Sequence, residues 1–332
     1  MPRLKAHLVW LALLLAGALP CAAASASNGA SPEPWRDWQT SLQVDHALAG
    51  RIWSTGRKAF VAPAELAAAL AGADFVLIGE THDNADHHRL QAWLIAALAK
   101  RRKPAVVMEM IGLEQADALG RYLAQDGADA SGLGAAVAWS KRGWPPWAMY
   151  RPIAEAALAA KLAIRAGDVP RATLRRVSRE GLETIEAARR KRLLLDRPLG
   201  TALDAALLKE LAASHCGLLP ERVLPAMSKV QRLRDAVLAD SLIDAGRPDG
   251  AVLIAGNGHV RTDRAVPWYV ARRLPKARIL SVMLIELDAE TKRPEDGLIT
   301  DPDGKAAADF VWYTPRRDRE DPCESLRKHL AK

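Results

Sequence analysis

The sequence predicts an α/β protein with a parallel or mixed sheet flanked by helices and an inserted all-helical subdomain. Short runs that are apolar on both faces alternate with segments of helical periodicity, which is typical of strands covered on both sides of a sheet. One long stretch, 170–247, contains no strand-like run. With 49% hydrophobic and 26% charged residues, the chain of 332 residues has a globular composition and is long enough for a large core.

The expected elements follow the chain in order. A short hairpin is predicted over 46–53, where Gly50 permits a turn, and a helix over 63–70 starts with Pro63 in its first turn. The apolar runs that predict strands are 75–78, 105–109, 162–166, 251–255, 279–285 and 310–314. Helical periodicity covers 84–100, 113–125, 150–160 and 263–274, and, in the stretch without strands, 171–194, 200–213 and 219–245.

The N-terminus is typical of a secretory signal. Basic residues precede an apolar run at 8–19, which is too short to span a bilayer, and small residues suited to cleavage follow it. The next residues are small and polar, which favours a flexible leader. The predicted parts are therefore a signal peptide (1–24), a flexible leader (25–40), an α/β core (41–169 and 248–332) and a helical subdomain inserted in that core (170–247).

Cysteine usage agrees with export to the periplasm. Cleavage after Ala24 leaves Cys216 and Cys323, which in an oxidising compartment most simply form a disulfide; two separate buried thiols are the alternative. Cys21 leaves open a lipid-modified cysteine and thus a membrane-attached lipoprotein. Pro20 directly before it argues against that processing, so a soluble periplasmic product is the main expectation.

The charge pattern argues against a nucleic-acid partner. Lys and Arg number 47 against 39 Asp and Glu, a formal net charge of +8, but the positive residues are scattered among acids. Such interspersed charges are typical of a solvated surface, and no recognition module with interleaved aromatic residues is present.

Candidate chemistry gathers at the strand ends. Glu80 and His82 follow the run at 75–78, Glu109 ends the next run, and His259 follows the run at 251–255. The carboxyl ends of parallel strands meet at one sheet edge, so these side chains are expected together. Histidines with carboxylates suit a divalent metal or acid–base work. Two further histidines, His87 and His88, are expected on an exposed helix face.

A second cluster runs from Trp139 to Arg151. Three tryptophans in nine residues stand just before Tyr150 and Arg151, in a chain with only 5% aromatic residues. One interpretation is a satellite core under a loop. The other is an aromatic wall for a flat apolar ligand, with Tyr150 as an oxygen ligand to ferric iron and Arg151 as the partner of a carboxylate.

Several segments, in order along most of the chain, carry a resemblance to a known family; they are 76–84, 106–110, 143–152, 215–220, 231–235, 254–261 and 321–324. They resemble the ChaN-like iron-regulated haem-binding (lipo)proteins of Gram-negative bacteria. The resemblance implies a helix-flanked sheet with a small helical subdomain, haem uptake or handling in the cell envelope, and a homodimer with haem at the subunit interface. Components of outer-membrane haem uptake are then expected partners.

The main hypothesis is therefore a haem-binding protein rather than an enzyme. The haem would be non-covalent and b-type, because no CxxCH attachment motif is present. Tyr150 would bind the iron as a phenolate, and His82 or His259 would assist from the other side. Arg151 and Arg261 would pair with the propionates. The residues expected in the cofactor site are Tyr150, His82, His259, Arg151, Arg261, Trp144 and Trp147.

A metal-dependent hydrolase is the alternative. The strand-end residues are also similar to those of the distantly related erythromycin-esterase and Tiki-type hydrolases. In that case a divalent metal would replace haem and activate a water. Its ligands or catalytic residues would be Glu80, His82, Glu109 and His259.

Overall fold

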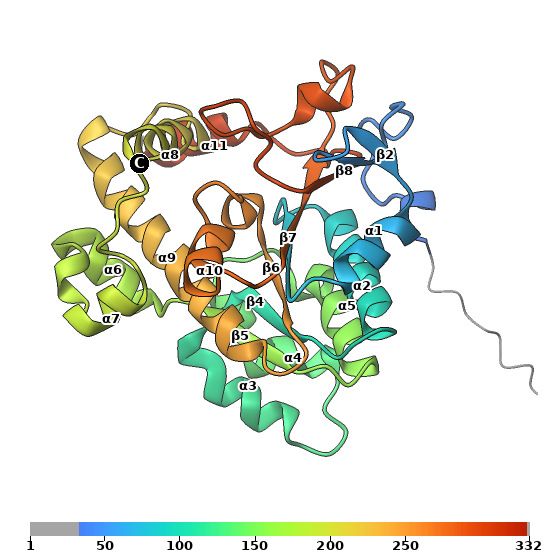
Figure 1. Ribbon diagram of the computed structural model, residues 1–332, viewed down its shortest axis with the longest axis horizontal. Helices are drawn as coiled ribbons and strands as arrows, with labels where there is room; N and C mark the ends of the chain where they lie inside the picture. The colour runs from blue at the N-terminus through green and yellow to red at the C-terminus, as the bar shows by residue number, and fades with distance from the viewer. Residues whose placement is uncertain (1–32, 331–332) are drawn as a thin grey trace, which may run out of the picture. The chain divides into compact units, whose positions relative to one another are not determined.

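The apolar runs form one eight-stranded mixed sheet in the computed structural model, which describes residues 33–330 (Figure 1). The strand order is β2-β1-β8-β7-β3-β6-β4-β5. The strands from β8 to β5 run parallel, and β1 and β2 add an antiparallel edge. This confirms the predicted α/β class. The strands are β1 (Ile52–Ser54), β2 (Ala59–Val61), β3 (Phe75–Glu80), β4 (Ala105–Gly112), β5 (Ile164–Asp168), β6 (Ala251–Gly256), β7 (Ile279–Glu286) and β8 (Phe310–Thr314).

Helices cover both faces of the sheet. Within residues 33–330 they are α1 (Pro63–Ala71), α2 (Ala85–Ala99), α3 (Ala116–Leu123), α4 (Ala130–Ala136), α5 (Trp147–Ala159), α6 (Arg171–Glu180), α7 (Ala187–Arg192), α8 (Thr201–Ser214), α9 (Leu224–Ala245), α10 (Val266–Arg273) and α11 (Pro322–Leu330). The sequence patterns did not predict α4 or α11. Short 3-10 turns connect several of these helices, and one of them, η6 (Asn257–Val260), directly follows β6.

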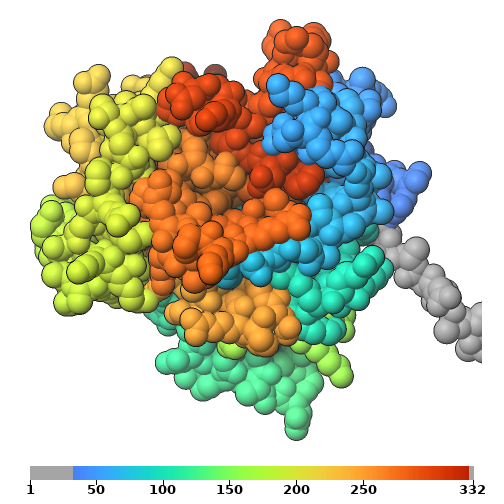
Figure 2. Space-filling view, viewed as in Figure 1, coloured from blue at the N-terminus to red at the C-terminus, as the bar shows by residue number. Residues whose placement is uncertain are grey.

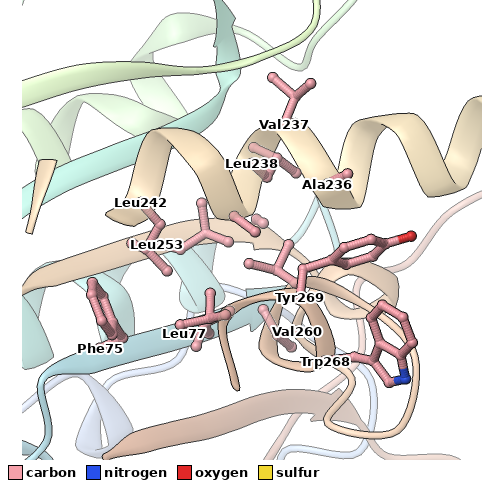
Figure 3. Packing of buried hydrophobic residues seen from close by; sticks show 14 of the residues in the cluster. Phe75, Leu77, Ala236, Val237, Leu238, Leu242, Leu253, Val260, Trp268 and Tyr269 are labelled. Carbon is pink, nitrogen blue, oxygen red and sulfur yellow. The ribbon is translucent and has the colours of Figure 1, made fainter. Parts of the chain in front are cut away.

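Two apolar layers explain why the strands are apolar on both faces. Along β3, Phe75 and Leu77 belong to the core layer under α9 and α10, and Figure 3 shows both in the same cluster as Leu253 and Tyr269. Val76 and Ile78 point to the opposite layer, where α1, α2 and α5 pack. Because both faces are covered, neither face of the strand needs polar residues.

The stretch from α6 to α9 contains no strand, as predicted, but its helices differ from the expected ones. The helix predicted over 171–194 is broken at Gly181, whose φ of +91° lies outside the helical region and favours glycine. The 22-residue helix α9 packs on β4, β5 and β6. It therefore covers the sheet as well as carrying the smaller helices, and the division into core and subdomain stays a prediction.

The beginning of the described chain is held against the fold. The predicted signal peptide and the first part of the leader lie outside the described residues. Residues 33–40 are not a free leader, however: the Asp86 carboxylate accepts from the backbone N–H groups of Gln39 and Thr40, and Trp35 packs edge-on to Trp93. Within 33–330, no helix has both the length and the apolar composition that a membrane span requires.

A disulfide joins two helical segments that are far apart in the sequence. Cys216, just after α8, is bonded to Cys323 in α11 across a separation of 107 residues. Figure 1 shows α8 and α11 side by side. The pairing predicted from the cysteine count is therefore present, and it ties the C-terminal helix to the helical stretch.

Candidate functional site

The predicted strand-end residues meet at one edge of the sheet. Glu80 ends β3, and its register partner on the adjacent strand β6 is Gly256, which leads into η6 and His259. Glu109 comes from β4, on the other side of β6. Gly79 allows this convergence, because a Cβ there would collide with Asn257 of η6.

One oxygen of Glu80 organises the accessible half of the site. The Oε1 atom accepts hydrogen bonds from Nδ1 of His82, at 2.8 Å, and from the hydroxyl of Tyr150, at 2.7 Å. The other oxygen lies 3.5 Å from Nε2 of His88. The ring of His88 is in turn stacked on Tyr150, with centroids 3.9 Å apart. Glu80 is thus surrounded by polar groups from the segment after β3, from α2 and from α5.

Electrostatics fix the protonation of this group. Burial raises the pKa of Glu80, but the neighbouring His88 and His82 rings outweigh it and hold that pKa well below its usual value. Burial and the adjacent Glu80 charge raise the pKa of Tyr150, so it stays a neutral phenol. Burial lowers the pKa of His82, but its hydrogen bond to Glu80 and the charge of Glu109 raise it overall.

His82 is the member of this group that reaches the surface. Its side chain is 36% exposed, whereas that of Glu80 is fully buried. Because a carboxylate only accepts, Nδ1 of His82 carries a proton. The raised pKa favours a second proton on Nε2, so a metal that binds Nε2 has to displace that proton. Among the described residues Nε2 makes no hydrogen bond. The ring packs against Trp144, with centroids 4.9 Å apart, and over Gly256, where a Cβ would lie 3.0 Å from Nε2.

The other half of the site is a buried ion network. Glu109 accepts from Arg234 at 2.5 Å and from the backbone N–H of Gly256 at 2.7 Å. Arg234 also binds Asp168 at the end of β5. His259 donates from Nδ1 to Asp235 at 2.6 Å, and its Nε2 lies 3.4 Å from Glu109. These contacts tie three strands of the sheet to α9.

His259 is an imidazolium in this network. Burial and the Arg234 cation lower its pKa, but Glu109 and Asp235 raise it overall to about 10. Both ring nitrogens therefore donate, and neither offers a lone pair to a metal. The Glu109 carboxylate is not free for a metal either, because it is paired with Arg234. Consistently, no group of three or more His, Cys, Asp or Glu residues within 33–330 is arranged to hold a metal ion.

Tryptophans line a hollow, and one of them, Trp144, also contacts the His82 ring. A cavity of about 430 Å³ is lined by Trp139, Trp144 and Trp147 together with Gly134, Ala135, Ser140 and Pro146. Gly134 lets α4 approach, because a Cβ there would lie 2.5 Å from the Trp147 ring. The indole N–H groups are already bonded to backbone carbonyls, Trp144 to Met110 and Trp147 to Ala130. Only the apolar faces of the rings are left for a ligand.

Several residues predicted for the cofactor site have other partners. Tyr150 is fully buried with its hydroxyl on Glu80, so ligation of iron by Tyr150 stays a prediction that this geometry disfavours. Arg151 pairs on the surface with Glu155 at 3.0 Å. Arg261 is 3% exposed and is held by Asp263 and Glu210. The paired Arg261 is therefore not free for a propionate.

One expectation about α2 is corrected, and two residues of α9 were missed. His87 and His88, expected on an exposed face, are both fully buried, because the first turn of α2 folds back under the end of β3. His87 accepts from the N–H of Thr81 and contacts the hydroxyl of Thr314. Arg234 and Asp235 were assigned no role. The sequence did contain a sign of their burial, because these two charged residues stand between apolar residues of the predicted helix.

Fold and site together define an α/β protein whose sheet edge holds a histidine–carboxylate pair beside a tryptophan-lined hollow. The chain belongs to the family described as "Haem-binding uptake, Tiki superfamily, ChaN", whose model matches residues 66–270, more than half of its length.

One solved structure agrees with this fold. The chain is similar to ChaN of Campylobacter jejuni, described as showing cofacial heme binding, with 20% identity and a TM-score of 0.61 over 79% of this chain and 95% of that one. An erythromycin esterase, EreC, in its open conformation has 12% identity and a TM-score of 0.41 over 78% of this chain and 95% of that one. A comparison with curated proteins gives no match.

Proposed function

We propose that this protein binds haem non-covalently at the sheet edge, with His82 as the residue that faces the iron. The observation that carries the proposal is the state of the His82 ring. Its Nδ1 is bound to Glu80, and its side chain is 36% exposed and packs against Trp144. Membership of a haem-binding family supplies the cofactor class.

The donor set fits a haem better than a bare metal ion. Haem iron already has four nitrogens from its macrocycle and needs only one or two protein ligands, whereas a structural or catalytic divalent ion needs three or more. At this edge of the sheet the described residues offer one accessible imidazole, that of His82, and no metal-binding cluster. Trp144 and Trp147 supply apolar faces of the kind on which a flat macrocycle packs. The metal-hydrolase alternative lacks such support.

Glu80 would act on haem through His82. A carboxylate that accepts from the remote nitrogen of a ligating histidine fixes the tautomer and makes the other nitrogen a stronger donor. The Glu80 carboxylate is held in its charged form by the surrounding rings. Tyr150 donates to the same oxygen and holds it in place. We therefore assign Glu80 and Tyr150 positioning roles and His82 the contact with iron.

The finer biology is part of the same proposal. Because His82 is exposed on one side only, a second copy of the chain could supply the opposite face of the ligand. ChaN of Campylobacter jejuni is described as binding heme cofacially, and two copies of this chain that face each other would hold ligands in that way. The signal-like N-terminus supports a role in haem uptake or handling in the cell envelope, in the periplasm or, if Cys21 is lipidated, at a membrane.

A haemin titration tests the proposal. We expect the wild-type protein to give a saturable Soret band, and His82→Ala to weaken binding at least tenfold and change that band. His215→Ala, in the loop after α8, is the matched control and should behave as wild type. Sedimentation with and without haemin would report the dimer. Equal binding by wild type and His82→Ala would refute the assignment of His82.

A further inference from the structure

One small lobe carries most of the excess positive charge of the protein. It comprises residues 171–197, with α6 and α7, and we call it the basic lobe. It contains nine Arg and Lys residues and four Asp and Glu residues, a net charge of +5, against +8 for the whole chain. Elsewhere in the sequence acids nearly balance the basic residues, so most of the net positive charge lies in this lobe. Figure 1 shows α6 and α7 together beyond α9, and Figure 2 shows this yellow-green region at the left edge of the molecule.

Most of these cations are not neutralised within the protein. Arg190 pairs with Asp196, and Arg192 pairs with Asp240 of α9. Arg171 donates to backbone carbonyls at the end of the tryptophan loop. The remaining basic side chains of the lobe are exposed and form no ion pair with any residue in 33–330; they are Arg175, Arg176, Arg179, Arg189, Lys191 and Arg197.

The apolar residues of the lobe are used to hold it in place. Val177, Ile185 and Leu193 are at most 4% exposed and belong to the same core layer as α9. The lobe therefore has no apolar face left to insert into a membrane or to cover with a partner helix. Any partner that it binds is recognised through charge, on a fixed outward surface.

We propose that the basic lobe docks the protein on an anionic lipid surface. Clusters of four to eight Lys and Arg residues are the pattern that binds anionic headgroups, and arginine binds phosphate in a bidentate manner. A nucleic acid is less well matched. The lobe contains no aromatic residue on which a base stacks and no Asn or Gln to read a base edge.

The charge also favours a broad surface over a single small anion. The six free cations are spread over two helices and the segment after them, and none of them lines the tryptophan cavity or three other cavities of the described chain. A bilayer presents many phosphates at once and needs no shaped pocket. This inference does not rest on haem binding.

Vesicle sedimentation tests the docking surface. The full chain is mixed with vesicles of phosphatidylglycerol and phosphatidylcholine, or of phosphatidylcholine alone. We expect binding to the anionic vesicles only, and its loss between about 0.1 M and 1 M salt, where the screening length falls from about 10 Å to about 3 Å. Neutral vesicles report any binding by the apolar N-terminal run, which every variant shares.

Two triple variants with the same change of charge locate the surface. Arg175→Gln, Arg176→Gln and Arg179→Gln together should weaken vesicle binding about a hundredfold, since each cation near an anionic bilayer gives about a fivefold gain. The control changes Lys100, Arg101 and Lys103, three exposed cations after α2, to Gln. It should bind nearly as wild type.

Three results would overturn the proposal: no binding of wild type to anionic vesicles, equal binding by the lobe variant at an unchanged denaturation midpoint, or tighter lobe-dependent binding to duplex DNA than to vesicles. The last result would identify a nucleic acid as the partner.

Discussion

Nδ1 of His82 lies 2.8 Å from the Glu80 oxygen that also accepts a hydrogen bond from the Tyr150 hydroxyl. Glu80 is the last residue of β3 and His82 follows two positions later, yet the His82 side chain is 36% exposed and that of Glu80 is fully buried. The pair thus presents an imidazole to a ligand while its orientation is fixed from inside the protein.

Glu80→Gln should weaken haem binding about 10- to 100-fold, the usual effect of removing a partner of a metal-binding histidine. Glutamine keeps the shape but removes the charge that strengthens Nε2 of His82 as a donor. Absorption titrations with haemin measure the effect. Asp83→Asn is a suitable control, because Asp83 is next to His82 but pairs with Arg319. An unchanged affinity in Glu80→Gln would mean that the carboxylate does not act on the ligand.

Tyr150→Phe should leave the spectrum of bound haem unchanged and lower the free energy of unfolding by about 1–3 kcal/mol, because the buried Glu80 loses a donor. Denaturant unfolding and a haemin spectrum are the two measurements. Tyr122→Phe removes a hydroxyl that contacts Asp129 away from the site and serves as the control. Loss of a phenolate band in Tyr150→Phe alone would instead establish Tyr150 as the ligand.

Stability should fall as the pH rises from about 6.5 to 10 because of His259. Its pKa of about 10 in the folded protein exceeds its usual value of about 6.5, so the folded chain keeps a proton that the unfolded chain releases. The contribution is complete below pH 6.5 and lost above pH 10, at no more than about 1.4 kcal/mol per pH unit. Denaturant unfolding at several pH values measures this slope.

His259→Gln should flatten that slope and lower the free energy of unfolding at neutral pH by about 3–5 kcal/mol, since Glu109 and Asp235 lose a buried partner. His215→Gln should keep the wild-type slope. If His259→Gln kept the wild-type dependence of stability on pH, the proton that the folded chain retains would be bound at another group.

The strand ends were the predictable part of the site. Parallel strands finish at the same edge, so Glu80, Glu109 and His259 could be placed together from sequence alone. Arg234 could not, because which side chains of α9 face the sheet depends on how the helix packs. Nor could the burial of Tyr150, since the 3.6-residue period of α5 does not say which face meets β3. The end of a strand can be read from the neighbouring residues, whereas the orientation of a helix depends on packing with distant parts of the chain.

Replacing both Cys216 and Cys323 by Ser should lower the free energy of unfolding by about 2–5 kcal/mol, because the unfolded chain loses a cross-link that closes a loop of 107 residues. Denaturant midpoints of the oxidised wild type, the reduced wild type and the double variant give the measurement. Reduced wild type should match the variant. A variant as stable as the oxidised protein would show that the bridge does not form in solution.

Gly256→Ala offers the most selective test of the His82 site. The φ of Gly256 is −61°, which alanine adopts freely, so the change strains no backbone. Its new Cβ would lie 3.0 Å from both Cε1 and Nε2 of His82. Because the ring is half exposed, it can move away at a cost of about 1 kcal/mol, but it then leaves its position on Glu80. We expect at least a tenfold loss of haemin affinity, measured by absorption titration, with the fold retained.

Gly258→Ala is the matched control, two residues further on. Its nearest neighbour is a Glu210 oxygen 4.0 Å from the added Cβ, so neither the site nor the fold should change. A difference between the two alanine variants would therefore come from the His82 ring alone. If both bound haemin as tightly as wild type while remaining folded, the position of His82 would not matter to the ligand, and the iron would have to be held elsewhere on the protein.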